Sequence, residues 1–86
     1  MKSIIVTGGC GFIGVNFIRF LLEEIGFDGQ IINLDKLTYA GNPESLEDIA
    51  ERFPNNYHLV PMDICDPNVG EVFDRFKVDA ICHFAA

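Results

Sequence analysis

The chain has 86 residues, fewer than the roughly 100–150 of a typical domain, so we expect at most one domain. Its 13 acidic and 6 basic residues give a net charge of −7, and the basic residues are scattered along the sequence. An acidic chain without a basic cluster repels nucleic acid and anionic membrane surfaces, so the composition argues against both as partners.

The first part of the chain alternates two strands with one helix. The apolar, β-branched run at residues 2–7 predicts a strand buried on both faces of a parallel sheet. Apolar side chains at residues 11–25 leave only a narrow polar strip, which predicts a mostly buried helix, with Gly26 as its left-handed cap. Residues 30–35 repeat the pattern of a buried strand, and a loop follows at residues 36–41.

A second helix and a third strand come next. Asn42 suits an N-cap and Pro43 the first helical position, so the helix is expected to begin there. Residues 57–64 predict a strand. Pro61 lies within it and cannot donate to a neighbouring strand, which argues for an edge position.

The last part adds a third helix, beginning at Asp66 and Pro67, and a fourth strand over residues 78–86. The order β-α-β-α-β-α-β predicts an α/β fold with a Rossmann-type, doubly wound parallel sheet, here incomplete. The chain stops within or just past its fourth strand, which would leave an uncovered edge. We therefore expect residues 1–86 to be the N-terminal part of a longer protein.

The stretch VTGGCGFIG places Gly8, Gly11 and Gly14 between the first strand and its helix. A helix N-terminus there offers backbone N–H groups and partial positive charge to an anion. The first glycine permits a tight turn, the second lets a phosphate approach the backbone, and the third lets the helix pack close to the sheet. A turn that needs glycine for shape alone is the alternative, so the context decides.

That context includes Asp35, which closes the second strand 21 residues after Gly14. A carboxylate at this position accepts hydrogen bonds from the adenosine ribose of a dinucleotide. Because it would repel a 2′-phosphate, we expect NAD rather than NADP, although the neighbouring Lys36 weakens the preference. Asp63, after the third strand, either caps a turn or contacts the adenine together with Ile64.

The glycine spacing after Thr7 resembles the extended short-chain dehydrogenase/reductase family. NLDKLTYAGN, DICD and HFAA are similar to stretches of the dTDP-glucose 4,6-dehydratases within it, and the resemblance covers the whole chain. Pro61 and Met62 depart from it, since smaller residues are expected before Asp63. The NAD contacts expected from the motif and the resemblance together are Gly8, Gly11, Phe12, Ile13, Gly14, Asp35, Lys36, Leu37, Thr38, Asp63, Ile64, Phe84, Ala85 and Ala86.

The resemblance implies a lyase that acts on dTDP-glucose. In that family NAD takes a hydride from C4 of the sugar, water leaves across C5 and C6, and the hydride returns to C6. A Tyr-x-x-x-Lys motif and an Asp-Glu pair carry the catalysis, but Tyr39 and Tyr57 are each followed by proline four positions on. No catalytic residue is therefore assigned, and the 86-residue chain alone is expected to be inactive.

The same resemblance implies a homodimer when full-length, a place in dTDP-rhamnose biosynthesis, and a substrate domain outside this chain. Two alternatives stay open. Another NAD-dependent nucleotide-sugar epimerase or dehydratase, such as a UDP-glucose 4-epimerase, would share the fold. A non-catalytic NAD-sensing module would need only the dinucleotide site.

The remaining chemistry-bearing residues receive structural interpretations. The three cysteines are widely spaced, which favours a reducing cytoplasm and provides no metal site. Cys10 is interpreted as a small space-filling residue, and His83 as a packed core histidine. The apolar run after Met1 is too short for a signal peptide or a membrane span, so we expect a soluble protein.

Overall fold

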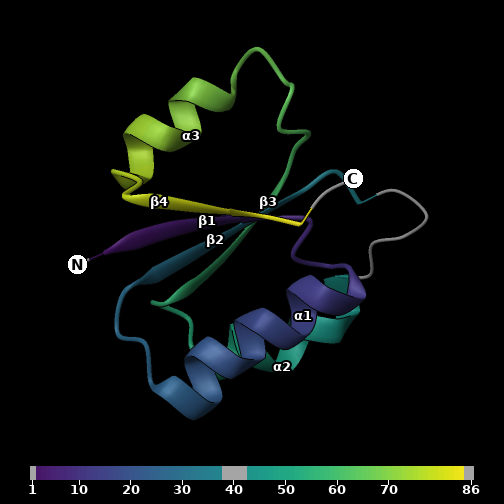
Figure 1. Cartoon of the computed structure of the whole chain (residues 1–86), viewed down its shortest axis with the longest axis vertical. Coiled ribbons are helices and arrows are strands. Elements are labelled where there is room, and N and C mark those ends of the chain that lie inside the picture. The colour runs from purple at the N-terminus through teal and green to yellow at the C-terminus, as the bar shows by residue number, and fades with distance from the viewer. Residues whose placement is uncertain (1, 38–42, 85–86) are drawn as a thin grey trace.

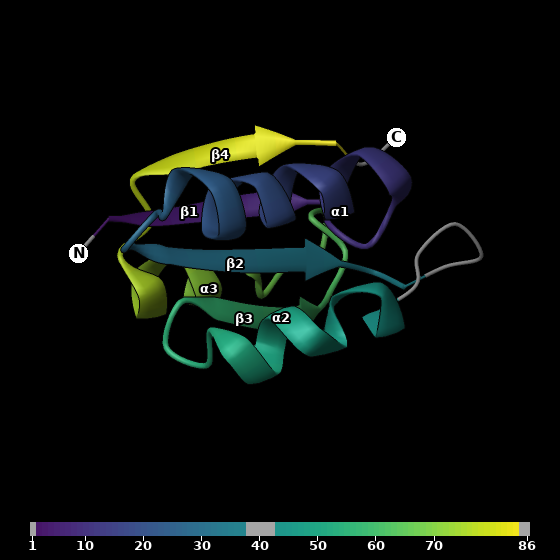
Figure 2. The ribbon, with the colours of Figure 1, turned by 90° about the horizontal axis from the view of Figure 1, so that it is seen from below.

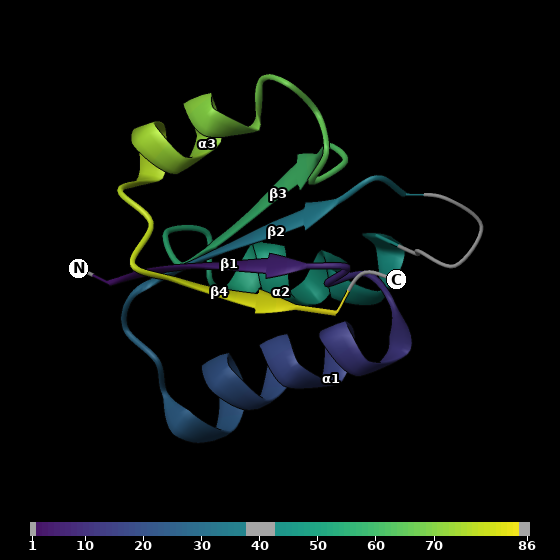
Figure 3. The ribbon, with the colours of Figure 1, turned by 45° about the horizontal axis from the view of Figure 1, so that its top comes forward.

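Four parallel strands form the centre of the molecule: β1 (Ser3–Thr7), β2 (Gln30–Asp35), β3 (Tyr57–Pro61) and β4 (Ala80–His83). This computed structural model describes residues 2–37 and 43–84. Across the sheet the order is β3-β2-β1-β4, and all four arrows point the same way (Figure 3). The chain moves outward from β1 to β3 and then returns to the other side of β1. The carboxyl ends of β1 and β4 therefore form the switch point of a doubly wound sheet.

Helices cover both faces of this sheet (Figures 1 and 2). On one face lie α1 (Phe12–Arg19), which continues as the π-helical segment η1 (Phe20–Ile25), the 3-10 helix η2 (Pro43–Leu46) and α2 (Glu47–Arg52). On the other face lies α3 (Val69–Phe76). The predicted alternation of strands and helices is confirmed. No helix in the described residues is long and apolar enough to span a membrane.

The hydrophobic core is divided by the sheet into two layers. Ile5 of β1 faces α3 while the next residue, Val6, faces α1, and both are fully buried. Ile31 and Ile32 of β2 alternate in the same way. Because both faces are covered, the central strands are apolar on both sides, which explains the continuous apolar runs in the sequence.

Several boundaries follow the prediction. The second strand has the expected extent, the first begins one residue later than expected, and Gly26 adopts the left-handed conformation at φ 73° where the first helix ends. β3 lies at the edge of the four-stranded sheet, as Pro61 indicated. β3 and β4 are shorter than expected, since they end at Pro61 and His83.

Two helix starts differ from the prediction. At Pro43 the chain forms the 3-10 helix η2, and the α-helix begins only at Glu47; the expected cap, Asn42, lies outside the described residues. The third helix begins at Val69 rather than at Pro67. The cause is a local turn, because Asp66 accepts a hydrogen bond from the N–H of Asn68 at 2.8 Å.

An ion-pair network joins α1 to the helices that follow β2. Arg19 donates to a carboxylate oxygen of Asp48 at 2.9 Å and to the carbonyl of Ser45 at 2.7 Å. Arg52 reaches back to Glu23 at 2.6 Å. Exposed pairs of this kind contribute only about 0–1 kcal/mol each. These pairs therefore add little to stability, although they connect the two helices on this face.

Candidate dinucleotide-binding site

The loop between β1 and α1 is hydrogen-bonded to the end of β2. The N–H of Gly8 donates to the carbonyl of Leu34 at 3.0 Å, and the N–H of Cys10 donates to Oδ2 of Asp35 at 2.9 Å. Within the loop, the N–H of Gly11 donates to the carbonyl of Gly8 at 3.1 Å. These bonds close a tight turn and hold it against the strand that carries the predicted ribose ligand.

The three glycines of the motif meet different requirements. Gly8 has a φ of 70°, a conformation that side-chain-bearing residues rarely adopt. A Cβ on Gly14 would lie 2.6 Å from the Cα of Gly9, so any side chain there would push α1 away from the loop. Gly11 has an extended backbone at φ −78°, and the nearest atom to a Cβ would be 3.4 Å away. The fold therefore requires Gly8 and Gly14, whereas a Cβ on Gly11 would meet the carbonyl oxygen of Gly8 at an ordinary contact distance, so the fold itself does not require glycine there.

The N-terminus of α1 lacks protein partners of the usual kind. Gly11 provides no side-chain cap, and the first turn contains no acidic residue. The first hydrogen bond along the helix is donated by Val15, so the preceding N–H groups have no acceptor within the helix. Phe12 and Ile13, at the start of α1, are 85% and 65% exposed. This arrangement suits an anion at the helix N-terminus.

Asp35 lies where the sequence predicted, at the end of β2 beside the glycine loop. Its side chain is held by two backbone groups: Oδ2 accepts from Cys10, and Oδ1 accepts from the N–H of Leu37 at 2.8 Å. Asp35 is buried, and a carboxylate offers about four acceptor positions, of which these two bonds use one on each oxygen. Thr38, the next expected contact, lies outside the described residues.

The carboxylate of Asp63 lies near Lys36, which follows β2, and also caps a turn. Its Oδ1 accepts from the N–H of Cys65 at 2.9 Å, and its Oδ2 lies 3.8 Å from Nζ of Lys36. The hydrogen bond from Cys65 lowers the pKa of the Asp63 carboxyl, and Lys36 adds to the effect. Ile64 packs against the core layer under α3. The turn-cap interpretation of Asp63 has direct support, and contact of Asp63 and Ile64 with adenine stays a prediction.

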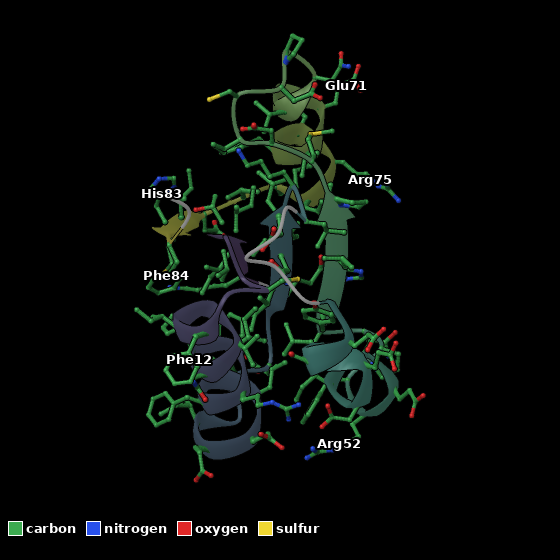
Figure 4. The ribbon with its side chains drawn as sticks, turned by 90° about the vertical axis from the view of Figure 1, so that its right-hand side faces the viewer. Phe12, Arg52, Glu71, Arg75, His83 and Phe84 are labelled. Atoms are coloured by element: carbon green, nitrogen blue, oxygen red, sulfur yellow. The ribbon has the colours of Figure 1, made fainter. Side chains whose placement is uncertain are left out.

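The end of β4 lies next to the end of β1. The N–H of Phe84 donates to the carbonyl of Thr7 at 2.9 Å, and its ring packs edge-on against Phe17, with centroids 5.3 Å apart. Phe12, His83 and Phe84 all lie at the left of Figure 4. Ala85 and Ala86 lie outside the described residues.

The interpretation of His83 as a packed core histidine is wrong. Its side chain is exposed, and Nδ1 lies 2.6 Å from Oγ1 of Thr7. The reason is the position of β4, which forms an edge of the four-stranded sheet in the described part of the chain.

Sequence reasoning missed a buried polar cluster beneath the loop. Asn33 is fully buried, and its Nδ2 donates to Oη of Tyr57 at 3.0 Å and to Sγ of Cys10 at 3.3 Å. Burial raises the pKa of the Cys10 thiol, which agrees with its space-filling interpretation. The available signal was one polar residue inside the otherwise apolar stretch IINL of β2.

The parallel sheet and the glycine loop docked on its second strand define this chain as part of a Rossmann-type α/β domain. The chain belongs to the GDP-mannose 4,6 dehydratase family, whose model matches residues 5–86.

Individual relatives agree with the resemblance inferred from the sequence. The chain is 43% identical over 85 residues to the dTDP-glucose 4,6-dehydratase of Salmonella typhimurium, covering 98% of this chain and 22% of the relative. Its fold matches the crystal structure of dTDP-glucose 4,6-dehydratase from Bacillus anthracis in complex with NAD, with a TM-score of 0.89 and 38% identity, over all of this chain and 27% of that one. A UDP-glucose-4-epimerase from Stenotrophomonas maltophila with bound NAD matches at a TM-score of 0.78 and 26% identity, over 100% of this chain and 25% of that one. The chain thus spans about a quarter of the length of these relatives.

The glycines allow a matched pair of substitutions. We expect Gly14→Ala to lower the free energy of unfolding by at least about 2 kcal/mol, because its methyl group would meet the loop backbone. Gly11→Ala should change it by less than about 1 kcal/mol, because its methyl group finds ordinary contact distances. Denaturant unfolding of both variants measures the difference. Equal losses for the two substitutions would contradict the assignment of different roles.

The raised pKa of the buried Tyr57 hydroxyl predicts that the stability of the fold depends on pH. Burial raises the pKa of its hydroxyl to about 12, from an ordinary value of 10.0. As the pH rises, the unfolded chain loses this proton first, so stability present below pH 10 is lost progressively toward pH 12. Tyr57→Phe should show a smaller decrease in the free energy of unfolding between pH 9.5 and 11 than the unsubstituted protein. The same decrease in both proteins would contradict the assignment.

Proposed function

We propose that this chain provides the NAD-binding part of a dTDP-glucose 4,6-dehydratase. The observation that carries the proposal is Gly11, a glycine that the fold itself does not require, at an uncapped helix N-terminus, with Asp35 held beside it through Cys10. The pyrophosphate of a dinucleotide fits the first feature and the adenosine ribose fits the second. The NAD-bound structures of related dehydratases support the same assignment.

The residues divide into groups along the dinucleotide. Backbone at Gly8, Gly11 and Gly14 approaches the pyrophosphate, with Phe12 and Ile13 at the same helix end. Asp35 accepts from the ribose hydroxyls, and its charge disfavours the 2′-phosphate of NADP. The remaining proposed contacts follow the ends of β2, β3 and β4 along the chain: Lys36, Leu37, Thr38, Asp63, Ile64, Phe84, Ala85 and Ala86. Of these, the contacts at Thr38, Ala85 and Ala86 rest on the family resemblance alone.

The chain's contribution is binding and orientation. NAD, when bound, supplies a hydride acceptor for C4 of the sugar and returns the hydride to C6 after water has been eliminated. Tyr57 is unsuited to act as a general base, because it is buried beneath the loop with a pKa of about 12. The catalytic residues and the substrate domain are proposed to lie in the part of the protein outside this chain.

The rest of the proposal follows the relatives. Residues 1–86 form the N-terminal part of the NAD(P)-binding domain, which is consistent with a chain that spans about a quarter of the relatives' length. The substrate is dTDP-glucose, the full-length protein is a cytoplasmic homodimer, and the reaction belongs to dTDP-rhamnose biosynthesis. A nucleotide-sugar epimerase is the second candidate, because the UDP-glucose-4-epimerase match shares the same fold.

Turnover distinguishes the candidates. The full-length protein, incubated with NAD and dTDP-glucose, should give the 4-keto-6-deoxy product, detected by mass spectrometry as the loss of one water. An epimerised sugar without water loss would favour the epimerase. NAD binding without any turnover would favour a sensing module, and turnover by the 86-residue chain alone would contradict the division of roles.

The preference for NAD over NADP tests the proposed role of Asp35 as the ribose ligand. In the full-length protein, Asp35→Asn should reduce the preference for NAD over NADP at least about tenfold, because the charge that repels the 2′-phosphate is removed. Asp74→Asn makes the same change of charge on the exposed surface of α3 and should leave the preference unchanged. Isothermal titration with each cofactor measures the ratio. An unchanged ratio in Asp35→Asn would place the ribose elsewhere.

A further inference from the structure

Three consecutive residues of β2 contact the glycine loop. The carbonyl of Leu34 accepts from Gly8, and the carboxylate of Asp35 accepts from Cys10. The side chain of Asn33 also contacts Cys10, through its sulfur. The contacts of Asn33 with the loop are made by its side chain, and the proposed function gives that side chain no role.

The Asn33 amide fits closely under the loop. It is fully buried, and besides its bonds to Cys10 and Tyr57 it lies against Gly9. A Cβ on Gly9 would be 2.5 Å from Cγ of Asn33, so a side chain at this position would require the amide or the loop to move. Within the described residues, Oδ1 has no hydrogen-bond partner. The position of the loop and the position of the amide therefore determine each other.

Stability alone does not account for a buried amide at this position. An incompletely bonded polar group costs free energy in a core, whereas an apolar side chain of similar size would not. Ile31, on the same face of β2 two residues earlier, is a buried apolar residue of the core layer that faces α1. An amide instead supplies directional contacts, which fix geometry.

We infer that Asn33 is a positioning residue, which holds Gly9 and Cys10 so that the loop presents its backbone to the dinucleotide. The inference rests on the proposed function of the loop. Asn33 acts through the loop and itself touches no ligand. The competing explanation is that the amide serves only to satisfy the buried hydroxyl of Tyr57.

Two variants of the full-length protein separate these explanations. Asn33→Leu keeps the branched shape of the side chain but removes both hydrogen bonds, and it leaves the Tyr57 hydroxyl buried without its donor. Asn33→Leu combined with Tyr57→Phe also removes that hydroxyl. We expect NAD affinity to fall at least tenfold in both variants, while the temperature of unfolding falls in the first and recovers in the second. Recovery of affinity together with stability in the second variant would overturn the inference.

Ile31→Val provides the matched control. Ile31 lies on the same strand and the same face, pairs with Ile4 and Tyr57, and loses one methylene in this variant, which lowers the temperature of unfolding. NAD affinity in this variant should stay within twofold of the unsubstituted protein. A tenfold loss of NAD affinity would show that any weakening of β2 disturbs the site, and it would contradict the specific role of Asn33.

The rate of hydrogen exchange at the Gly8 and Cys10 amides measures how firmly the loop is held against β2 in the absence of NAD. Exchange at both should become faster in Asn33→Leu, and unchanged exchange would overturn the positioning role. Failure of the unsubstituted protein to bind NAD would instead overturn the proposed function, so the two failures are distinguishable.

A second pair of variants applies if Asn33→Leu does not fold. Gly9→Ala should weaken NAD binding at least tenfold where Asn33 is present, because its methyl group meets the amide. In an Asn33→Ala background the same substitution should cost less than threefold, since the amide is gone. Equal losses in both backgrounds would overturn the inference.

Discussion

The close approach of the first helix to the first strand governs this structure. It is possible only because Gly14 presents no side chain to the backbone of Gly9, and because Gly8 turns the chain through a left-handed conformation. Once that approach is made, the loop lies against the end of β2 and brings Cys10 to Asp35. The start of the helix and the carboxylate, which come from different elements, are then connected through the loop.

Much of the fold was accessible from the sequence, because its strongest signals are local. The runs at β1 and β2 are apolar on both faces, and Pro61 indicated an edge strand without reference to any other residue. The starts of α2 and α3 were less accessible. At Asp66 a side-chain hydrogen bond competes with the helix, and residue type alone does not decide between them.

The candidate site shows the same division. Gly8, Gly11, Gly14 and Asp35 could be found because their spacing along the chain reflects a strand, a loop and a helix in succession. Asn33 could not, because its partners Cys10 and Tyr57 are 23 and 24 residues away and meet it only after the sheet has formed. His83 was misjudged for a related reason, since its exposure depends on which strand flanks β4.

Cys10 has a consequence for how the site withstands oxidants. Its sulfur lies beneath the loop, next to the neutral amide of Asn33, and burial keeps it in the thiol form. A neutral thiol reacts slowly with peroxides and alkylating reagents, because the thiolate is the nucleophile. It also adds no negative charge beside a helix end suited to an anion. Burial thus makes the cysteine in the middle of the glycine loop a poor nucleophile, although it lies beside the backbone proposed to bind an anion.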